Sequence, residues 1–290
     1  MEAKAKYIWY NGNFVKWQEA NLHLLTYGLH YGCGAFEGIR IYDGKAFELA
    51  KHIKRLRNSA AACGIDIRFS DEALIEATNQ LIKKNQLTQG YIRPLAWLSS
   101  ETLVLASPDI YSEIAIACWP SFYDQKTKPR LKFTIADWRK APDNSFPNRH
   151  KTTASYMVHS MVKRDAKAKG FDDALILDQE GYITEASTSN FFVITDKVII
   201  TPAPGNFLLG ITRAKVIDLC NKHDIPLIER KIHITDLPKI DAIGAFITGT
   251  AVELTEIESI DLQLHKLVFE KTPKLYTQLF ELFQQMTRTA

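Results

Sequence analysis

Hydrophobic residues alternate with polar ones, or form short runs, over several stretches of the chain, and this pattern predicts strands. The pairs Asn11-Gly12 and Asp43-Gly44 interrupt two of these stretches. Because such pairs supply the positive φ of tight turns, we expect hairpins over residues 7–17 and 38–49. Further strands are predicted over residues 91–98, 113–119, 131–137, 174–178, 182–185, 190–195, 198–201 and 245–247.

Apolar residues at helical spacing predict five longer elements, over residues 49–63, 71–85, 155–169, 211–223 and 267–286. Gly64 and Gly170 are expected to end two of these helices, and Ser70 to cap the start of another. Helices and hairpins alternate irregularly, which argues against a parallel doubly wound sheet. The pattern favours an α/β chain of the α+β type with mixed or antiparallel sheets.

A polar segment near the middle of the chain predicts a division into two domains. Residues 123–129 contain Asp124, Gln125 and Lys126 and interrupt the apolar pattern. We therefore expect a small N-terminal domain over residues 1–123, a linker over 124–130 and a larger C-terminal domain over 131–290. Residues 141–149, which include two prolines, are expected to be irregular.

Composition narrows the class of protein. The chain has 290 residues, of which 46% are hydrophobic and 24% charged, with a formal net charge of +3. These values are typical of globular proteins, and the interspersed acids argue against nucleic-acid or membrane partners. The four cysteines are widely spaced and form no CxxC pair, so we expect reduced thiols, no metal site and a cytoplasmic location. The chain contains no apolar signal core and no apolar run of membrane length.

Four polar features suggest amine chemistry. Lys151 is predicted at the start of a helix, where the dipole lowers the pKa of an amine and favours Schiff-base formation. Glu185 lies between buried segments and suits a protonated pyridine nitrogen. The Gly/Thr turns at residues 210–213 and 248–251 offer backbone N–H groups to an anion. Together these features predict a site for pyridoxal 5′-phosphate.

Taken singly, these residues also fit ordinary structural roles. Lys151 alone is consistent with an exposed lysine, Tyr156 with a core tyrosine and Arg55 with an exposed helix charge. Arg93 is predicted in an apolar strand and needs a partner, which is a substrate carboxylate, an internal acid such as Glu37, or both. The glycine- and aromatic-rich stretch over residues 31–40 suits the wall of an apolar pocket.

Several short strings follow one another in a fixed order. They are His30-Tyr31-Gly32, Phe36-Glu37-Gly38-Ile39-Arg40, His52-Ile53-Lys54-Arg55-Leu56, Tyr91-Ile92-Arg93-Pro94-Leu95, Lys151 to Tyr156, Gly181 to Asn190, Gly210-Ile211-Thr212-Arg213 and Gly249 to Glu253. In order and spacing the chain closely resembles the class IV, or fold-type IV, pyridoxal-phosphate aminotransferases, and within them the branched-chain amino acid aminotransferases. The resemblance implies a two-domain fold whose second, cofactor-binding domain is a pseudo-barrel.

The resemblance also implies the role of each site residue. Lys151 looks like the catalytic Schiff-base lysine, Glu185 like the partner of the ring nitrogen, and Tyr156 like the bond to the cofactor's phenolic oxygen. The phosphate cup would be Arg55, Ile211, Thr212 and Thr250. The substrate site would be Phe36, Gly38, Arg40, Tyr91, Arg93, the Thr250-Ala251 backbone, Tyr123 as a closing residue and Tyr31 from the neighbouring subunit.

The activity implied is transamination by a homodimer or larger oligomer. L-Leucine, L-isoleucine or L-valine would react with 2-oxoglutarate to give branched 2-oxo acids and L-glutamate, with Lys151 moving the Cα proton. The string Glu185 to Asn190 looks more like that of D-amino acid aminotransferases, and the lead-in over residues 143–149 also departs from the common branched-chain string. The alternatives are therefore a D-amino acid or (R)-amine transaminase and aminodeoxychorismate lyase. A non-catalytic scaffold that binds the cofactor is a further alternative, against which Lys151 and Glu185 argue.

Overall fold

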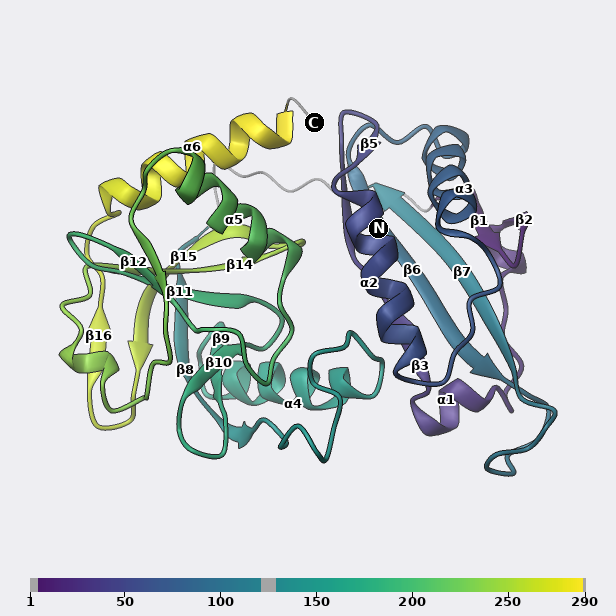
Figure 1. The fold of residues 1–290 in the computed structure, drawn as a ribbon, viewed down its shortest axis with the longest axis horizontal. Helices are drawn as coiled ribbons and strands as arrows, with labels where there is room; N and C mark the ends of the chain where they lie inside the picture. The colour runs from purple at the N-terminus through teal and green to yellow at the C-terminus, as the bar shows by residue number, and fades with distance from the viewer. Residues whose placement is uncertain (1–4, 121–128, 289–290) are drawn as a thin grey trace. The chain divides into compact units, whose positions relative to one another are not determined.

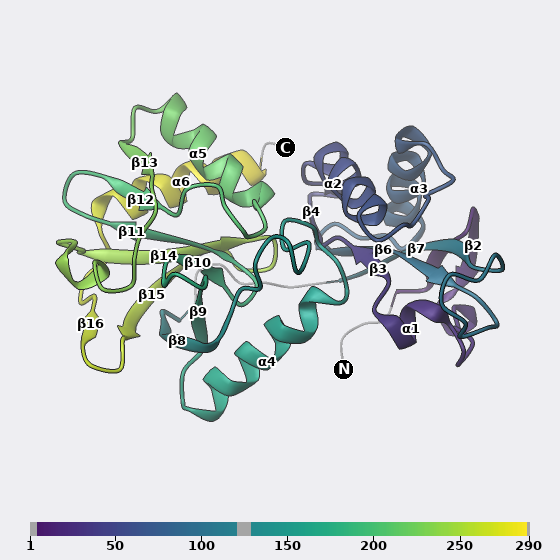
Figure 2. The same ribbon diagram turned by 60° about the horizontal axis from the view of Figure 1, so that its bottom comes forward.

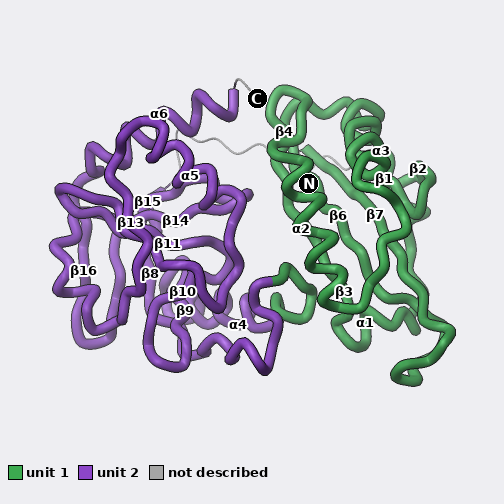
Figure 3. The backbone as a smooth tube through the Cα atoms, in the orientation of Figure 1, with its two compact units in different colours: residues 1–123, 150–156, 290 green, residues 124–149, 157–289 purple. Residues whose placement is uncertain are grey.

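The structure is a computed structural model that describes residues 5–120 and 129–288 (Figure 1). These residues form two compact units (Figure 3). Unit 1 comprises residues 5–120 and 150–156, and unit 2 comprises residues 129–149 and 157–288. Tyr123 and most of the predicted linker lie outside the described residues.

Unit 1 is built on an antiparallel sheet. Its strands run in the order β2-β1-β7-β6-β4-β5, and β3 also pairs with β6. The two predicted hairpins are confirmed, because Tyr10 pairs with Asn13 and Tyr42 pairs with Lys45 across the expected turns. The strands are β1 (Tyr7–Tyr10), β2 (Asn13–Lys16), β3 (Gly34–Phe36), β4 (Ile39–Tyr42), β5 (Lys45–Ala46), β6 (Gly90–Ser99) and β7 (Tyr111–Pro120).

Two helices, α2 (Leu49–Ala61) and α3 (Asp71–Lys84), lie together on one face of this sheet (Figure 2). Their apolar stripes, which include Ile53 and Leu81, are buried against the strands and form the core of unit 1. Ser70 caps α3 as predicted, since its hydroxyl accepts a hydrogen bond from the Ala73 N–H at 3.2 Å. The short helix α1 (Tyr27–Tyr31) and the 3-10 turn η1 (Trp17–Glu19) complete the unit.

Unit 2 contains a mixed sheet in the order β10-β9-β8-β15-β14-β11-β12-β13, with β16 paired to β15. Strand β8 is parallel to both β9 and β15, β12 is parallel to β13, and the remaining pairs are antiparallel. The predicted mixed α/β class is therefore confirmed. The strands are β8 (Leu131–Arg139), β9 (Asp173–Leu177), β10 (Ile183–Ala186), β11 (Asn190–Ile194), β12 (Ile199–Thr201), β13 (Leu227–Glu229), β14 (Gly244–Gly249), β15 (Glu253–Asp261) and β16 (Lys266–Val268).

Successive side chains of β11 enter different cores of unit 2. Phe191 and Val193 join the core inside the curled sheet, whereas Phe192 and Ile194 pack outward against α5 and α6. On the outer side of β8 and β9, α4 forms a third core. The sheet thus curls as a half-barrel with helices outside it, as expected (Figure 1). The helices are α4 (Ser155–Ala168), α5 (Ile211–Lys222), α6 (Lys274–Arg288) and the 3-10 turn η3 (Leu237–Lys239).

The predicted closing helix over residues 267–286 is wrong at its start. Residues 266–268 form β16 and pair with β15, and α6 begins only at Lys274. Pro273 lies directly before α6, where its fixed φ and missing N–H suit the start of a helix and not its interior. Strands β3, β13 and β15 and helix α1 were not predicted from the apolar pattern. None of the described helices is long and apolar enough to cross a membrane.

Candidate active site

Lys151 lies in an extended segment of unit 1 and not at a helix start, so that prediction is wrong. The Lys151 carbonyl accepts from the Phe36 N–H at 3.1 Å, and the Thr153 N–H donates to the Gly34 carbonyl at 2.8 Å. Thr152 forms an isolated bridge with Ala35. Because the backbone groups of this segment pair with β3, α4 begins only at Ser155. The helix dipole therefore does not explain the reactivity expected of this lysine.

The Lys151 amine instead lies among aromatic side chains. It donates a hydrogen bond to the phenolic oxygen of Tyr156, and its nitrogen is 4.9 Å from the centre of the Phe36 ring. Phe36 and Tyr156 meet edge to face with centroids 4.6 Å apart. Ser59 on α2 accepts from the Lys151 backbone N–H at 2.9 Å. The structure thus brings together three predicted site residues: Lys151, Tyr156 and Phe36.

Arg55 is held by a buried carboxylate. Glu37 has no exposed surface, and its two oxygens accept from Arg55 Nε at 2.7 Å and Nη2 at 2.9 Å. His52 donates from Nδ1 to the same carboxylate at 2.7 Å. Burial by itself raises the pKa of Glu37, but the charge and hydrogen bonds of Arg55, with His52, lower it to about 2. Glu37 is therefore ionised at neutral pH and fixes the plane of the guanidinium.

The histidine in this cluster is held neutral. Burial lowers the pKa of His52, and the positive charges of Arg55 and Lys151 lower it further, against the opposing effect of Glu37.

The ion pair considered for Arg93 and Glu37 does not form, because Glu37 pairs with Arg55 instead. The substrate-side role considered for Arg93 stays a prediction.

Arg40 lies on β4, Tyr91 and Arg93 lie on β6, and Gly38 directly precedes β4, whereas Tyr31 is exposed at the end of α1. Arg93 lies over the Phe36 ring at 4.7 Å, and its buried Nε has no hydrogen-bond partner among the described residues. Arg40 pairs with Tyr91 across the two strands and is almost wholly buried. A Cβ at Gly38 would collide with the Tyr91 hydroxyl, so only glycine fits beside that phenol.

Glu185 lies in unit 2 on β10, with only 4% of its surface exposed. One carboxylate oxygen, Oε1, is 2.5 Å from the Lys140 ammonium. The geometry of that ion pair is not that of a hydrogen bond, and Oε1 has no hydrogen-bond partner among the described residues. The ion pair compensates the burial of this charge, and the oxygen keeps the capacity to accept a hydrogen bond from a further donor.

The first Gly/Thr turn opens a helix, as predicted. Helix α5 begins at Ile211, and the preceding Gly210 has no side chain with which to cap it. Asn190 acts on this turn instead: its Oδ1 accepts from the Gly210 N–H at 3.0 Å, and its Nδ2 donates to the Leu208 carbonyl at 2.9 Å. A Cβ at Gly210 would collide with Asn190 Oδ1. Thr212 is buried in the first turn of the helix.

The second Gly/Thr turn lies beside the first. Thr248, at the end of β14, pairs with Asn190 at the start of β11, and its buried hydroxyl has no hydrogen-bond partner in the described part of the chain. The turn continues through Thr250, which is half-buried, and Ala251, which is exposed. Asn190, the last residue of the segment from Glu185 to Asn190, therefore contacts both turns: it accepts from Gly210 in the first and pairs with Thr248 in the second.

Comparisons with known proteins identify the family of the chain. The family model of class IV aminotransferases matches residues 34–260. The chain belongs to the class IV aminotransferases. It is 39% identical over 264 residues to a probable branched-chain-amino-acid aminotransferase of Rickettsia felis, a match that covers 91% of this chain and 90% of that protein.

Solved structures of branched-chain aminotransferases share the fold of this chain. The Escherichia coli branched-chain amino acid aminotransferase superimposes with a TM-score of 0.91 at 30% identity, covering 99% of this chain and 96% of that one. The branched-chain aminotransferase of the archaeon Thermoproteus uzoniensis, solved with norvaline, has a TM-score of 0.90 at 31% identity, covering 98% and 95%.

Class IV aminotransferases use pyridoxal 5′-phosphate, and the residues present fit this cofactor. Unit 1 supplies an amine and a phenol in contact, as an aldehyde with an adjacent phenolic oxygen requires. Unit 2 supplies a buried carboxylate oxygen without a hydrogen bond, for a ring nitrogen, and the start of a twelve-residue helix, for a phosphate. No group of three or more metal-binding side chains occurs among residues 5–120 and 129–288.

Five buried residues that contact the candidate residues, or contact a partner of one, were not predicted as site residues; Glu37 was considered only as a partner of Arg93. Glu37 and Asn190 stand inside strings that carry the family resemblance, but no role follows from their local pattern. Their partners lie far away in the sequence, so no local signal identifies them. The five are Glu37, His52, Lys140, His159 and Asn190.

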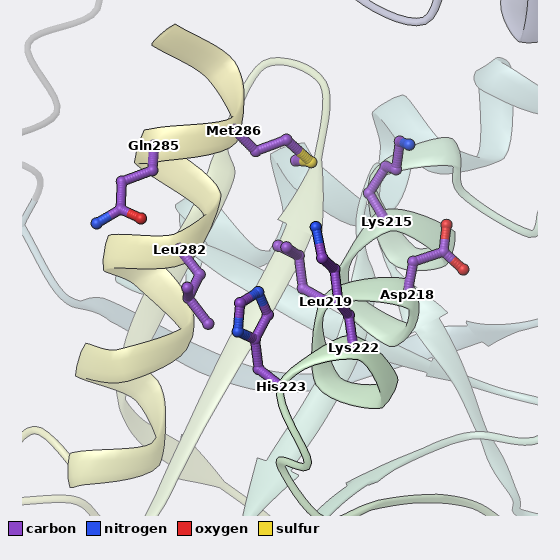
Figure 4. A pocket seen from close by; sticks show the side chains of 8 residues that line it. All are labelled: Lys215, Asp218, Leu219, Lys222, His223, Leu282, Gln285 and Met286. Atoms are coloured by element: carbon purple, nitrogen blue, oxygen red, sulfur yellow. The ribbon is translucent and has the colours of Figure 1, made fainter. Parts of the chain in front are cut away.

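A groove of about 540 Å³ lies elsewhere in unit 2, between α5 and α6. Figure 4 shows Lys222, the last residue of α5, and His223, the C-cap of that helix, facing Leu282 and Met286 of α6. None of the predicted site residues lines it. We therefore do not assign this groove to the reaction.

Proposed function

We propose that this protein transfers the amino group of L-leucine, L-isoleucine or L-valine to 2-oxoglutarate, giving the branched 2-oxo acid and L-glutamate. The observation that carries the proposal is the contact of the Lys151 amine with Tyr156, in a chain that matches branched-chain aminotransferases over nearly its whole length. When bound, pyridoxal phosphate supplies an aldehyde that takes up the amino group and a ring that takes up electrons from Cα.

In this proposal, Lys151 is the catalytic base. Its amine removes the proton from Cα of the amino acid, and the hydrogen bond with Tyr156 fixes the position of the nitrogen. Arg55, held in plane by Glu37, presents a rigid guanidinium to the phosphate. The buried ion pair matters here because a guanidinium of fixed orientation loses little rotamer freedom on binding.

Unit 2 is proposed to hold the ring nitrogen and the phosphate. Glu185 provides a charged hydrogen bond to the nitrogen through an oxygen that has no other hydrogen bond among the described residues. The N–H groups of Ile211 and Thr212 at the start of α5, with Thr250 from the neighbouring turn, form the phosphate cup. The Thr250-Ala251 backbone is proposed to take the substrate α-carboxylate.

The proposed substrate pocket must accept two unlike side chains. Phe36, Gly38 and Tyr91 provide an apolar wall for leucine, isoleucine or valine, with Tyr31 of the second subunit. Arg40 and Arg93 provide positive charge for the γ-carboxylate of glutamate. A branched-chain aminotransferase 32% identical to this chain has been solved both with N-(5′-phosphopyridoxyl)-L-glutamate and with 4-methylvaleric acid. Tyr123, proposed to close over the substrate, lies outside the described residues.

We expect L-leucine and L-isoleucine with 2-oxoglutarate to give the highest kcat/KM among a panel of donors. The apolar wall accommodates a branched chain, whereas D-alanine leaves it unfilled; each missing methylene reduces kcat/KM roughly 10- to 200-fold. The panel should contain L-leucine, L-glutamate, D-alanine, an (R)-aryl amine and aminodeoxychorismate. A higher kcat/KM for D-alanine or the (R)-amine would refute the branched-chain proposal, and pyruvate release from aminodeoxychorismate would favour the lyase.

A homodimer is proposed because unit 1 exposes a group of large apolar side chains. Leu24, Leu29 and Tyr31 lie in and before α1, and Val104 and Leu105 lie in the segment between β6 and β7. The Tyr31 hydroxyl donates to the Leu103 carbonyl at 2.8 Å and so ties the two segments together. Exposed apolar surface of this kind is typical of an interface. A second copy of the chain is the occupant that the family pattern implies.

The double variant Leu24→Arg/Leu29→Arg is expected to be monomeric and to lose most of its activity. Two charges would have to be buried at the interface without partners, and Tyr31 would no longer reach the second site. Sedimentation velocity and kcat/KM should be measured together. Leu264→Arg, at an exposed leucine in the turn before β16, is the matched control and should stay dimeric. A fully active monomeric wild type would exclude the dimer.

The predicted boundaries, with an N-terminal domain over residues 1–123, a linker over 124–130 and a C-terminal domain over 131–290, are retained as a proposal, as is the cytoplasmic location. The widely spaced cysteines support the second proposal, since all four are free. Residues 150–156 lie within the predicted C-terminal domain in sequence, but their contacts assign them to unit 1.

A further inference from the structure

The carboxylate of Glu185 has a buried cation beside it that the proposed reaction does not use. Lys140 follows β8 directly and is only 6% exposed, and its ammonium is 2.5 Å from Glu185 Oε1. Its backbone is fixed on both sides: the Lys140 N–H donates to the Leu177 carbonyl at 2.9 Å, and its carbonyl accepts from Gln179 at 2.7 Å. A buried ammonium is costly unless it has partners, so the groups around Lys140 indicate its role.

The second partner of Lys140 is His159 on α4, whose Nε2 is 3.1 Å from the ammonium. An ammonium group only donates hydrogen bonds, so Nε2 must be the acceptor and carry no proton. On the opposite side of the ring, Nδ1 contacts the Ser187 carbonyl, which only accepts, so Nδ1 must carry the proton. Two independent contacts therefore assign the same species, a neutral imidazole protonated on Nδ1.

This arrangement closes a ring of contacts around one carboxylate. Ser187 stands two residues after Glu185, in the turn closed by the Ala186 N–H donating to the Ser189 carbonyl at 2.8 Å. Lys140 thus contacts the Glu185 side chain, and through His159 it is also connected to the backbone of the same turn. The three buried side chains comprise one cation, one anion and one neutral ring, so their charges balance.

We infer that Lys140 and His159 are positioning residues for Glu185, an inference that rests on the proposed role of Glu185 at the ring nitrogen. The Lys140 ammonium holds the carboxylate in a fixed orientation whether or not the cofactor is bound. His159 keeps the ammonium in place and anchors it to the turn over residues 186–189. Neither residue is assigned a contact with substrate, so their loss should affect kcat and cofactor binding more than KM.

The closing experiment compares Lys140→Met, which removes the charge, with Lys140→Arg, which keeps it. Lys140→Met should lower kcat roughly 10- to 100-fold, the scale seen when outer partners of an active-site group are removed, and weaken cofactor binding about tenfold at nearly constant KM. Lys140→Arg should restore most of both values. Unchanged kcat and cofactor Kd in Lys140→Met would overturn the inference.

A second variant and a spectroscopic readout keep the test valid if Lys140→Met folds poorly. His159→Asn retains a donor for the Ser187 carbonyl but does not reach Lys140, and it should lower kcat several-fold while retaining the fold. With ¹⁵N-histidine labelling of the cofactor-free protein, the His159 signal, identified by its absence in this variant, should show a proton on Nδ1 only. A proton on Nε2 would overturn the inferred contact between His159 and Lys140.

These readouts separate the inference from the proposed function. The histidine tautomer and the dependence of cofactor binding on Lys140 are measured without any amino acid substrate. A wild-type protein that shows both but transaminates no branched-chain amino acid would refute the proposed substrate and support the positioning role of Lys140 and His159. Normal branched-chain turnover in Lys140→Met would support the function and refute that positioning role.

Discussion

Replacing Lys151 with alanine is expected to abolish the borohydride-reducible link to the cofactor and to lower kcat by about 10²- to 10⁴-fold, the scale of a lost general base. The variant should still bind pyridoxal phosphate, because Arg55, Glu185 and the start of α5 remain. The physical reason is local: Lys151 brings an amine against Tyr156 and Phe36, and alanine leaves no base at that position.

The measurements are cofactor occupancy by absorbance, borohydride trapping followed by mass determination, and kcat with L-leucine. Lys167→Ala is the matched control, since this lysine lies exposed on α4 and pairs with Asp172 at the surface. It should retain activity and the reducible link. Transamination at wild-type rate by Lys151→Ala would show that another group is the base.

Replacing Glu185 with glutamine is expected to keep the cofactor but slow proton removal by about 10²- to 10³-fold, as losing one preorganised electrostatic contact does. Glutamine has nearly the same shape but no negative charge, so the ring nitrogen loses its charged partner and the ring becomes a weaker electron sink. The same change leaves the Lys140 ammonium buried without its anion, so thermal stability should fall as well.

The kinetic effect must therefore be measured on folded, saturated enzyme. The deuterium isotope effect on kcat with Cα-deuterated leucine should rise in Glu185→Gln, because proton removal becomes slower than the other steps. Glu180→Gln, at an exposed acid in the preceding turn, is the control and should behave as wild type. An unchanged rate at full cofactor occupancy would refute the role of Glu185.

Local chemistry determined many elements of this fold. Asn11-Gly12 and Asp43-Gly44 specify tight turns wherever they stand, and both hairpins form as predicted. Ser70 caps α3 through contacts within four residues, and Gly210 precedes the helix that its motif predicts. Such features depend on neighbours along the chain, so a single sequence suffices to predict them.

The candidate residues themselves were also determined by the sequence. Lys151, Tyr156 and Phe36 were named from strings far apart in the chain, and the structure brings them together. The two Gly/Thr turns of unit 2 likewise meet beside Asn190. Recognition of these residues rests on the order of motifs along nearly the whole chain, which no single pattern contains.

The tertiary structure decided how these residues are held. Lys151 was expected at a helix start, but its backbone pairs with β3, more than a hundred residues earlier, and this long-range pairing overrides the local preference. The partners of Glu185 and Arg55 were not predicted for the same reason. Burial makes an isolated charge costly, so each buried ion must find a counter-ion, but only the folded chain specifies that Lys140 meets Glu185 and that Glu37 meets Arg55.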